Sequence, residues 1–92
     1  MDIGEAIKTI RKKKGLKQNE LAKKCGISAN ALCSIEQNKS FPSKETISSI
    51  CSALNIPIGF LLFSCLTDDD IPQDKLTVFK AIQKPILEVF GL

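Results

Sequence analysis

A chain of 92 residues with 43% hydrophobic and 25% charged residues is long enough for one small folded domain and too apolar for a disordered protein. No apolar run is long enough to span a bilayer, and residues 1–5 lack the basic and then apolar pattern of a signal peptide. We therefore expect a cytoplasmic protein that does not contact a membrane.

The residue inventory excludes most kinds of catalytic and metal site. The chain has no histidine, and its four cysteines lack paired Cys-x-x-Cys spacing. We expect no enzyme activity, no metal and no cofactor, because no nucleophile, base or ligand cluster is evident. Cys25 and Cys51 fall on apolar helical positions and are expected to be buried, whereas Cys33 and Cys65 are expected to be more exposed.

The net charge of +3 is unevenly distributed along the chain. Residues 1–66 hold ten Lys and Arg against five Asp and Glu, whereas residues 67–92 hold three against five. This split predicts a basic domain over residues 1–66 that binds nucleic acid, followed by an extension over residues 67–92 that does not.

The first predicted helix spans residues 3–14. Four apolar residues recur there at the spacing of one helical face: Ile3, Ala6, Ile7 and Ile10. A basic run, Arg11 to Lys14, follows in its last turn, where cations favour the helix dipole. The run is either a solvated helix end or, with Lys17, Lys23 and Lys24, part of a positive surface for phosphates.

Residues 18–36 predict two short helices joined at Gly26. Apolar residues recur at helical spacing on both sides of that glycine: Leu21, Ala22 and Cys25, then Ala31, Leu32 and Ile35. Gly26 suits a helix stop with positive φ, and the Ser28 hydroxyl can cap the second helix. This arrangement predicts a helix-turn-helix, whose second helix can enter a DNA major groove.

Two further helices are expected before residue 67. A loop at residues 37–42 contains Asn38, which tolerates a left-handed stop, and Ser43 can cap a helix that ends at Asn55. A short helix follows over residues 57–63, opened by Pro57. Its apolar side chains either complete the core or begin an interface.

The tail begins with an acidic run, Asp68 to Asp70, and Pro72, a pattern typical of a helix entry. Its aspartates lack the spacing of a calcium loop. An apolar stripe follows, with Pro85 expected to kink or split the helix: Leu76, Phe79, Ile82, Ile86 and Phe90. The stripe either folds back on its own domain or pairs with a second subunit, and we favour the dimer interface.

Across residues 3–62, these motifs resemble the lambda-repressor-like (Xre/Cro) helix-turn-helix family. The matching pattern is L-x-Q-x-E-L-A-x-x-x-G-I-S-x-x-x-L-x-x-I-E-x-x-K-x-x-P-S-x-E-T-I, which begins at Leu16. The resemblance covers about two thirds of the chain. It implies an all-α fold, a five-helix DNA-binding bundle with an additional C-terminal helix here, and a homodimer on a two-fold symmetric operator.

The resemblance also implies DNA-binding residues: Lys17, Gln18, Ser28, Ala29, Asn30, Cys33, Ser34, Asn38, Lys39 and Ser40. Gln18 is expected to reach a phosphate, although a polar residue in the first helical turn is an ordinary alternative. Asn30 can pair with adenine and Ala29 can contact a thymine methyl group, whereas Ser34 is either permissive or idle. Lys39 and the amides of Asn38 and Ser40 match a loop that grips the DNA backbone.

Three further features refine this picture. Arg11 and Glu36 match a partly buried salt bridge between the first and third helices, so Arg11 is expected to be structural. Lys17 replaces the family's usual threonine cap, which leaves that helix start less well fixed but adds a charge facing DNA. The reading face of the predicted recognition helix has no arginine, lysine or glutamine, so guanine contacts should be few. This predicts an A·T-leaning site with weak base contacts, read partly through DNA shape.

Two function classes follow from these patterns. The first is a sequence-specific DNA-binding transcriptional regulator, most simply a homodimeric repressor that occupies an operator. The alternative is a protein-interaction module, such as an antitoxin or the regulatory partner of a second protein, with residues 58–63 and 76–90 binding another chain. The basic face favours the first class, because a pure interaction module does not need it.

Overall fold

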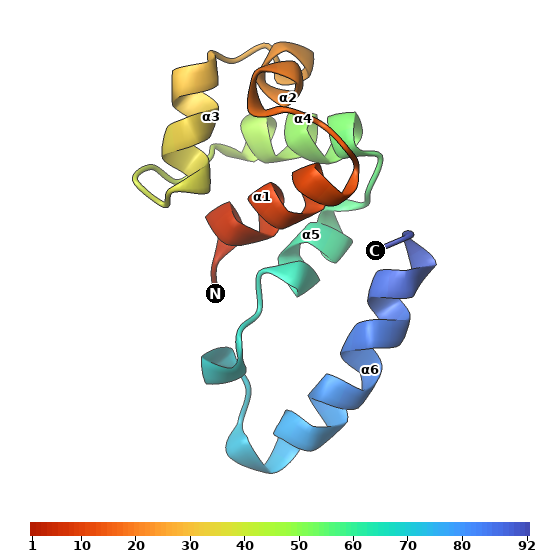
Figure 1. Cartoon of the computed structure of the whole chain (residues 1–92). Coiled ribbons are helices and arrows are strands. Elements are labelled where there is room, and N and C mark those ends of the chain that lie inside the picture. Colours follow the sequence, from red (N-terminus) through yellow and green to blue (C-terminus); the bar gives the residue numbers. More distant parts are fainter.

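A computed structural model describes residues 1–92, which form six α-helices and no strand (Figure 1). The helices are α1 (Ile3–Lys13), α2 (Gln18–Cys25), α3 (Ala29–Glu36), α4 (Lys44–Leu54), α5 (Ile58–Ser64) and α6 (Leu76–Val89). Two single 3-10 turns, Asp68–Asp70 and Gln73–Lys75, precede α6. The predicted all-α architecture, five helices with an additional C-terminal helix, is confirmed.

Local side-chain chemistry sets most helix ends. The side chains of three N-cap residues accept a hydrogen bond from a backbone amide three residues later, at 2.9, 3.0 and 3.2 Å: Asp2, Ser28 and Ser43. Gly26 and Asn55 end α2 and α4 in the left-handed conformation, with φ of 70° and 57°. The predicted caps and stops at Ser28, Ser43, Gly26 and Asn55 are therefore confirmed.

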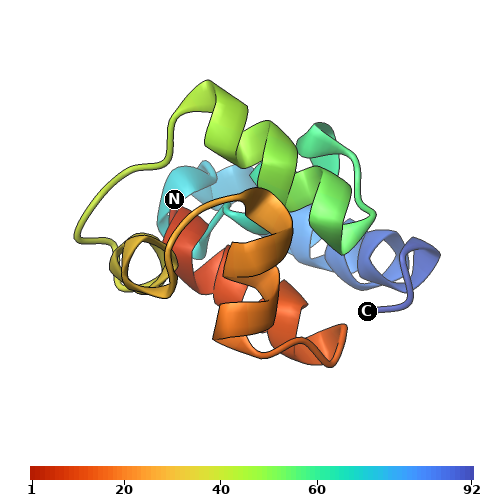
Figure 2. The same cartoon turned by 90° about the horizontal axis from the view of Figure 1, so that it is seen from above.

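The core lies between α1, α2, α3, α4 and α5. Figure 2 shows these helices around a common centre, and fifteen buried side chains form one continuous apolar cluster. The largest fully buried members come from all five helices: Ile7, Leu21, Leu32, Ile50, Leu54 and Leu61. Each contributes roughly 1.5 to 3 kcal/mol by leaving water, so the cluster fixes α3 rigidly on the bundle surface.

The four cysteines are free, and the structure corrects two predictions about them. Cys51 is buried as expected, whereas Cys25, which was also expected to be buried, is half-buried, as is Cys33. Cys65 is fully buried, because it follows α5 inside the core cluster, where its thiol donates to the Leu61 carbonyl oxygen at 3.1 Å. Desolvation by this burial raises the pKa of Cys65 to about 11.

Helix α6 packs against the bundle through aromatic side chains. It runs through Pro85 as a single α-helix and is not split there. Phe79 lies 5.6 Å from Phe63 and Phe90 lies 4.3 Å from Phe60, measured between ring centroids. These pairs fold the tail back onto α5.

The structure also places the five residues that were predicted as a dimer interface. Phe79 is buried, Ile86 and Phe90 pack against the core cluster, and Leu76 is half-buried. Ile82 alone among the five is exposed. An exposed row of apolar side chains follows another line along α6 instead: Val78, Ile82, Pro85 and Val89. Apart from Ile82, the predicted stripe thus folds back on its own domain, which was the alternative to a dimer interface, and the exposed row is what α6 leaves free.

No single helix has both the length and the hydropathy needed to cross a bilayer; α4 and α5 meet that test only when taken together, across a bend of 97°.

Candidate nucleic-acid interface

Helices α2 and α3 form the predicted helix-turn-helix. Gly26, with its left-handed φ, ends α2, and Ile27 donates its amide to the Ala22 carbonyl oxygen at 3.1 Å. Ser28 then caps α3 through the amide of Ala31. The turn is held by backbone hydrogen bonds on both sides, so α3 is presented at a fixed angle (Figure 1).

The outward face of α3 carries short polar and apolar side chains. Leu32, Ile35 and Glu36 are buried, whereas Ala29 and Asn30 are exposed. Cys33 and Ser34 are half-buried. The predicted base-contacting positions therefore lie on the solvent side of the helix, and their roles on DNA stay a prediction.

Sequence reasoning missed Gln37, which ends α3. This residue is exposed and follows Asn30 and Ser34 at the spacing i, i+4, i+7, so the three lie along one side of the helix. Counting that interval onward from Asn30 would have found it. Its amide can pair with adenine N6 and N7 as an asparagine amide can. The outward row thus includes a glutamine, and the preference expected for A·T pairs is unchanged.

A buried ion pair fixes α3 to α1. Arg11 Nε lies 2.8 Å from Glu36 Oε2 and Arg11 Nη2 lies 3.1 Å from Glu36 Oε1, with the two side chains 8% and 2% exposed. Arg11 Nη1 also donates to the Leu16 carbonyl oxygen at 2.8 Å. Arg11 therefore has the structural position that the resemblance implied, and its charge faces Glu36 and not solvent.

Gln18 joins this network from the start of α2. Its Nε2 donates to Glu36 Oε1 at 3.0 Å. An amide nitrogen carries two hydrogens, so this bond occupies one and leaves the second for another acceptor. The predicted phosphate contact stays a prediction, and the structure supplies the bond that would orient the side chain for it.

Lys17 starts α2 without a side-chain cap, as its sequence predicts. Its backbone amide instead donates to Glu20 Oε1 at 2.9 Å, which satisfies the amide that lies before the helix. The Lys17 side chain is exposed and its ammonium forms no ion pair. The charge is thus available to an anion.

The loop after α3 uses its backbone amides internally. Asn38 donates to the Ile35 carbonyl oxygen at 3.0 Å, and the amides of Lys39 and Ser40 both point to the Ser34 carbonyl oxygen, at 2.9 and 3.4 Å. The amides of Asn38 and Ser40 are therefore engaged with the end of α3. What this loop leaves for a phosphate is the side chains of Lys39 and Ser40, both of which are exposed.

Asn38 also ties the loop to α1. Its Oδ1 accepts from the Gly4 amide at 3.1 Å, and its Nδ2 donates to Asp2 Oδ1 at 2.8 Å. Bonds from the Glu5 amide and from Asn38 lower the pKa of Asp2. The Asn38 side chain is thus committed to the fold, and its own φ of 60° is the predicted left-handed stop.

The lysines of residues 1–66 form no ion pairs. Every one of them except Lys8 is exposed. Both interpretations of the basic run, a solvated helix end and a phosphate-facing surface, fit this arrangement. Arg11 is the exception within the run, because it is buried.

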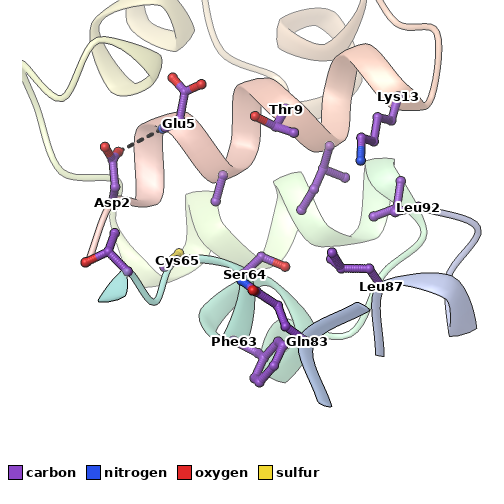
Figure 3. A pocket seen from close by; sticks show the side chains of 13 residues that line it. Asp2, Glu5, Thr9, Lys13, Phe63, Ser64, Cys65, Gln83, Leu87 and Leu92 are labelled. Carbon is purple, nitrogen blue, oxygen red and sulfur yellow. Dashed lines mark hydrogen bonds between the residues drawn. The ribbon is translucent and has the colours of Figure 1, made fainter. Parts of the chain in front are cut away.

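A cavity lies elsewhere, between α1, α5 and α6 (Figure 3). This cavity of about 260 Å³ has Asp2 and Glu5 at one end and Lys13 at the other, and its lining includes apolar side chains such as Ile10 and Leu87. No residue of α2, α3 or the loop after α3 lines this cavity, so it is separate from the surface that they form.

Comparison with known proteins agrees with this geometry. A family model described as helix-turn-helix, HTH_3, matches residues 7–61. The chain is 36% identical over 62 residues to an immunity repressor protein of Bacillus phage phi105, covering 67% of this chain and 43% of that protein. It is 38% identical over 61 residues to the transcriptional regulator SinR of Bacillus subtilis, covering 65% of this chain and 55% of SinR.

The matched segment spans about half the length of these curated relatives. Among solved structures, the clp gene regulator ClgR from Corynebacterium glutamicum aligns with 96% of this chain and 85% of its own, with a TM-score of 0.68. At 24% identity, this likeness shows the fold alone.

Proposed function

The chain belongs to the HTH_3 helix-turn-helix family, and from this we propose that it is a sequence-specific DNA-binding regulator of transcription, acting as a repressor on a two-fold symmetric operator. The observation that carries the proposal is the outward row of α3, Asn30, Ser34 and Gln37. This row is held rigidly by the buried pair of Arg11 and Glu36. Rigid presentation matters because base contacts depend on geometry within hydrogen-bonding distance.

Charge supports the same proposal. Lys17 precedes α2 and Lys39 follows α3, so an exposed cation stands near each end of the motif. Phosphate contacts from such positions fix a protein on the duplex while α3 lies in the major groove. Gln18, oriented by Glu36, adds a neutral donor next to Lys17.

Helix α6 offers a candidate surface for the predicted homodimer. Its exposed polar side chains form one strip: Thr77, Lys80, Lys84 and Glu88. The inward row packs on α5, and the exposed row of Val78, Ile82, Pro85 and Val89 lies between the strip and the inward row. A helix with two apolar rows is typical of one that packs on its own domain and on a second subunit. We therefore place the dimer contact on the row Val78, Ile82, Pro85 and Val89 and keep residues 67–92 as a separate extension.

The alternative, a protein-interaction module, draws on the same exposed row. Ile58 and Leu62 of α5 are also exposed, at 43% and 41%, and could serve a different chain. The unpaired lysines around α2 and α3 favour DNA, because an apolar partner would not use them.

One experiment tests the proposal. The purified full chain selects duplexes from a random pool, and binding of the winning sequence is then measured across a salt series. We expect a two-fold symmetric site with half-sites about one helical turn apart and an affinity that falls steeply with salt. Recovery of no motif from a folded protein would overturn the proposal and favour the interaction module.

The dimer is tested by sedimentation of wild-type protein and of the Ile82→Ser variant, with Thr77→Ala on the polar strip of α6 as the matched control. We expect a dimer for the wild type and the control and a shift toward monomer for Ile82→Ser. A wild-type monomer that remains monomeric on operator DNA would contradict the homodimer.

A further inference from the structure

Phe41 differs from every other phenylalanine in the chain. The remaining four are buried or half-buried and form two aromatic pairs, Phe60 with Phe90 and Phe63 with Phe79. Phe41 is 72% exposed and lies in the loop between α3 and α4. Its side chain therefore contributes little to the core.

The loop that carries Phe41 is anchored on both sides. Before it, the amides of Lys39 and Ser40 bond to the Ser34 carbonyl oxygen, and the Asn38 side chain bonds to α1. After it, Pro42 is buried and its ring fixes φ. Figures 1 and 2 both show this loop extending outward from the bundle beside α3. An exposed apolar ring is thus held outward by a constrained backbone, which lowers the entropy cost of using it in a contact.

The chemistry around Phe41 suits a nucleic-acid backbone. Lys39 and Ser40 precede it and Lys44 follows. Asp2 lines the same hollow as Phe41, and its carboxylate accepts from Asn38 Nδ2 at 2.8 Å. The charges of Lys39 and Lys44 are unpaired. Proteins that bind the minor groove frequently insert an apolar side chain such as phenylalanine between base steps and use Lys, Arg, Asn or Gln in the same groove.

The position of the loop agrees with this chemistry. Eight residues of α3 span about 12 Å, which is about the width of the major groove. With the start of α3 over the base edges, we expect the loop after it to lie near the sugar-phosphate backbone that borders the groove. Phe41 lies two residues beyond Lys39, a reach of at most about 7 Å from a lysine on that backbone.

We propose that Phe41 contacts DNA by insertion: its ring enters the minor groove beside each half-site and partly unstacks one base step. The proposal rests on the DNA-binding function proposed above and adds a second means of selecting sequence. Pyrimidine–purine steps unstack most easily, so Phe41 selects a flexible step just outside the bases faced by Asn30. This contact supplies discrimination that the short side chains of α3 do not.

The test uses the full chain and the operator that the wild-type protein selects. A fluorescent base analogue, 2-aminopurine, replaces adenine at the step flanking each half-site, and duplex ends carry a donor and acceptor dye to report bending. We compare the wild type with Phe41→Ser and Phe41→Leu. Leu62→Ser, which removes an exposed apolar side chain from α5, is the matched control.

We expect binding of the wild type and of Leu62→Ser to raise the 2-aminopurine fluorescence and to bend the duplex. Phe41→Leu should give both signals to a smaller degree. Phe41→Ser should lose both signals and about tenfold in affinity, with an unchanged salt dependence because no charge is removed. The DNA site that Phe41→Ser selects should keep the two half-sites and lose the preference for a flexible base step beside them. Its melting temperature should match that of the wild type, because the side chain is exposed.

Three results would overturn the inference. A Phe41→Ser variant that binds and bends the operator as the wild type does would remove Phe41 from the contact while leaving the proposed function intact. A loss of affinity accompanied by a lower melting temperature, with unchanged fluorescence, would assign Phe41 a structural role. A wild-type protein that selects no motif would overturn the proposed function and this inference together.

Discussion

Removing the carboxylate of Glu36 should be among the most damaging single changes in this protein. Glu36 accepts from Arg11 Nε, Arg11 Nη2 and Gln18 Nε2, at 2.8, 3.1 and 3.0 Å. In Glu36→Ala, the guanidinium of Arg11, 8% exposed, loses its counter-charge while staying away from water. Breaking a buried pair in this way costs about 3 to 5 kcal/mol.

That cost is a large part of the total stability of a domain this size, which is about 5 to 15 kcal/mol. At 4 to 8 °C per kcal/mol, the melting temperature should fall by roughly 12 to 40 °C. Urea unfolding followed by circular dichroism measures the change directly. A loss below about 1 kcal/mol would refute the reasoning, because that is the range of solvent-exposed pairs.

The double variant Arg11→Met with Glu36→Leu separates stability from function. Replacing both charges with apolar side chains leaves no buried charge, so stability should recover most of the loss. Gln18 then loses the acceptor that orients it, and operator affinity should remain reduced. A double variant as unstable as Glu36→Ala would show that the cost does not come from the unpaired arginine.

Three further predictions test other parts of the structure. Gly4→Ala places a Cβ 2.5 Å from the Ile35 carbonyl oxygen and should lower stability by about 1 to 3 kcal/mol in urea unfolding; wild-type stability would contradict the close packing of α1 on α3. Asn30→Ala should cost about 1 to 3 kcal/mol at one base-pair position in binding assays, and an equal loss on every sequence would remove its assignment as a base contact. Burial raises the pKa of Cys65 to about 11 from an ordinary 9.0, so the thiol loses its proton more readily in the unfolded chain. The protonated thiol of Cys65 therefore contributes its full share of stability below pH 9, and this share is lost as pH rises toward 11. Unfolding midpoints at pH 8 and 10.5 measure this decline, which should be smaller in Cys65→Ala, and an equal decline in both proteins would count against it.

Sequence alone determined the elements and the motif, because these depend on short-range interactions. Ser28, Ser43, Gly26 and Asn55 act on amides and carbonyls within a few residues, so their effect can be predicted from their order in the chain. The helical spacing of apolar residues likewise predicted the buried side of α1, α2 and α3, except at Ala31, which is exposed. The helix-turn-helix followed from these two signals together.

Tertiary structure decided which apolar face α6 would bury. Most of the predicted stripe turned inward through Phe79 and Phe90, since α5 offers Phe63 and Phe60 as partners, whereas Ile82 of that stripe stayed outside beside Val78. Periodicity cannot choose between rows, because both have helical spacing.

Contacts between distant segments were also beyond the sequence. The burial of Cys65 depends on the position of α5 in the core, and the bond from Gln18 to Glu36 joins residues 18 positions apart. The Asn38 side chain looks free in the sequence but is held by Asp2 and Gly4 across more than thirty residues. Each of these contacts depends on how whole helices pack against one another. That packing is determined by all the core contacts together, and no local sequence pattern encodes it.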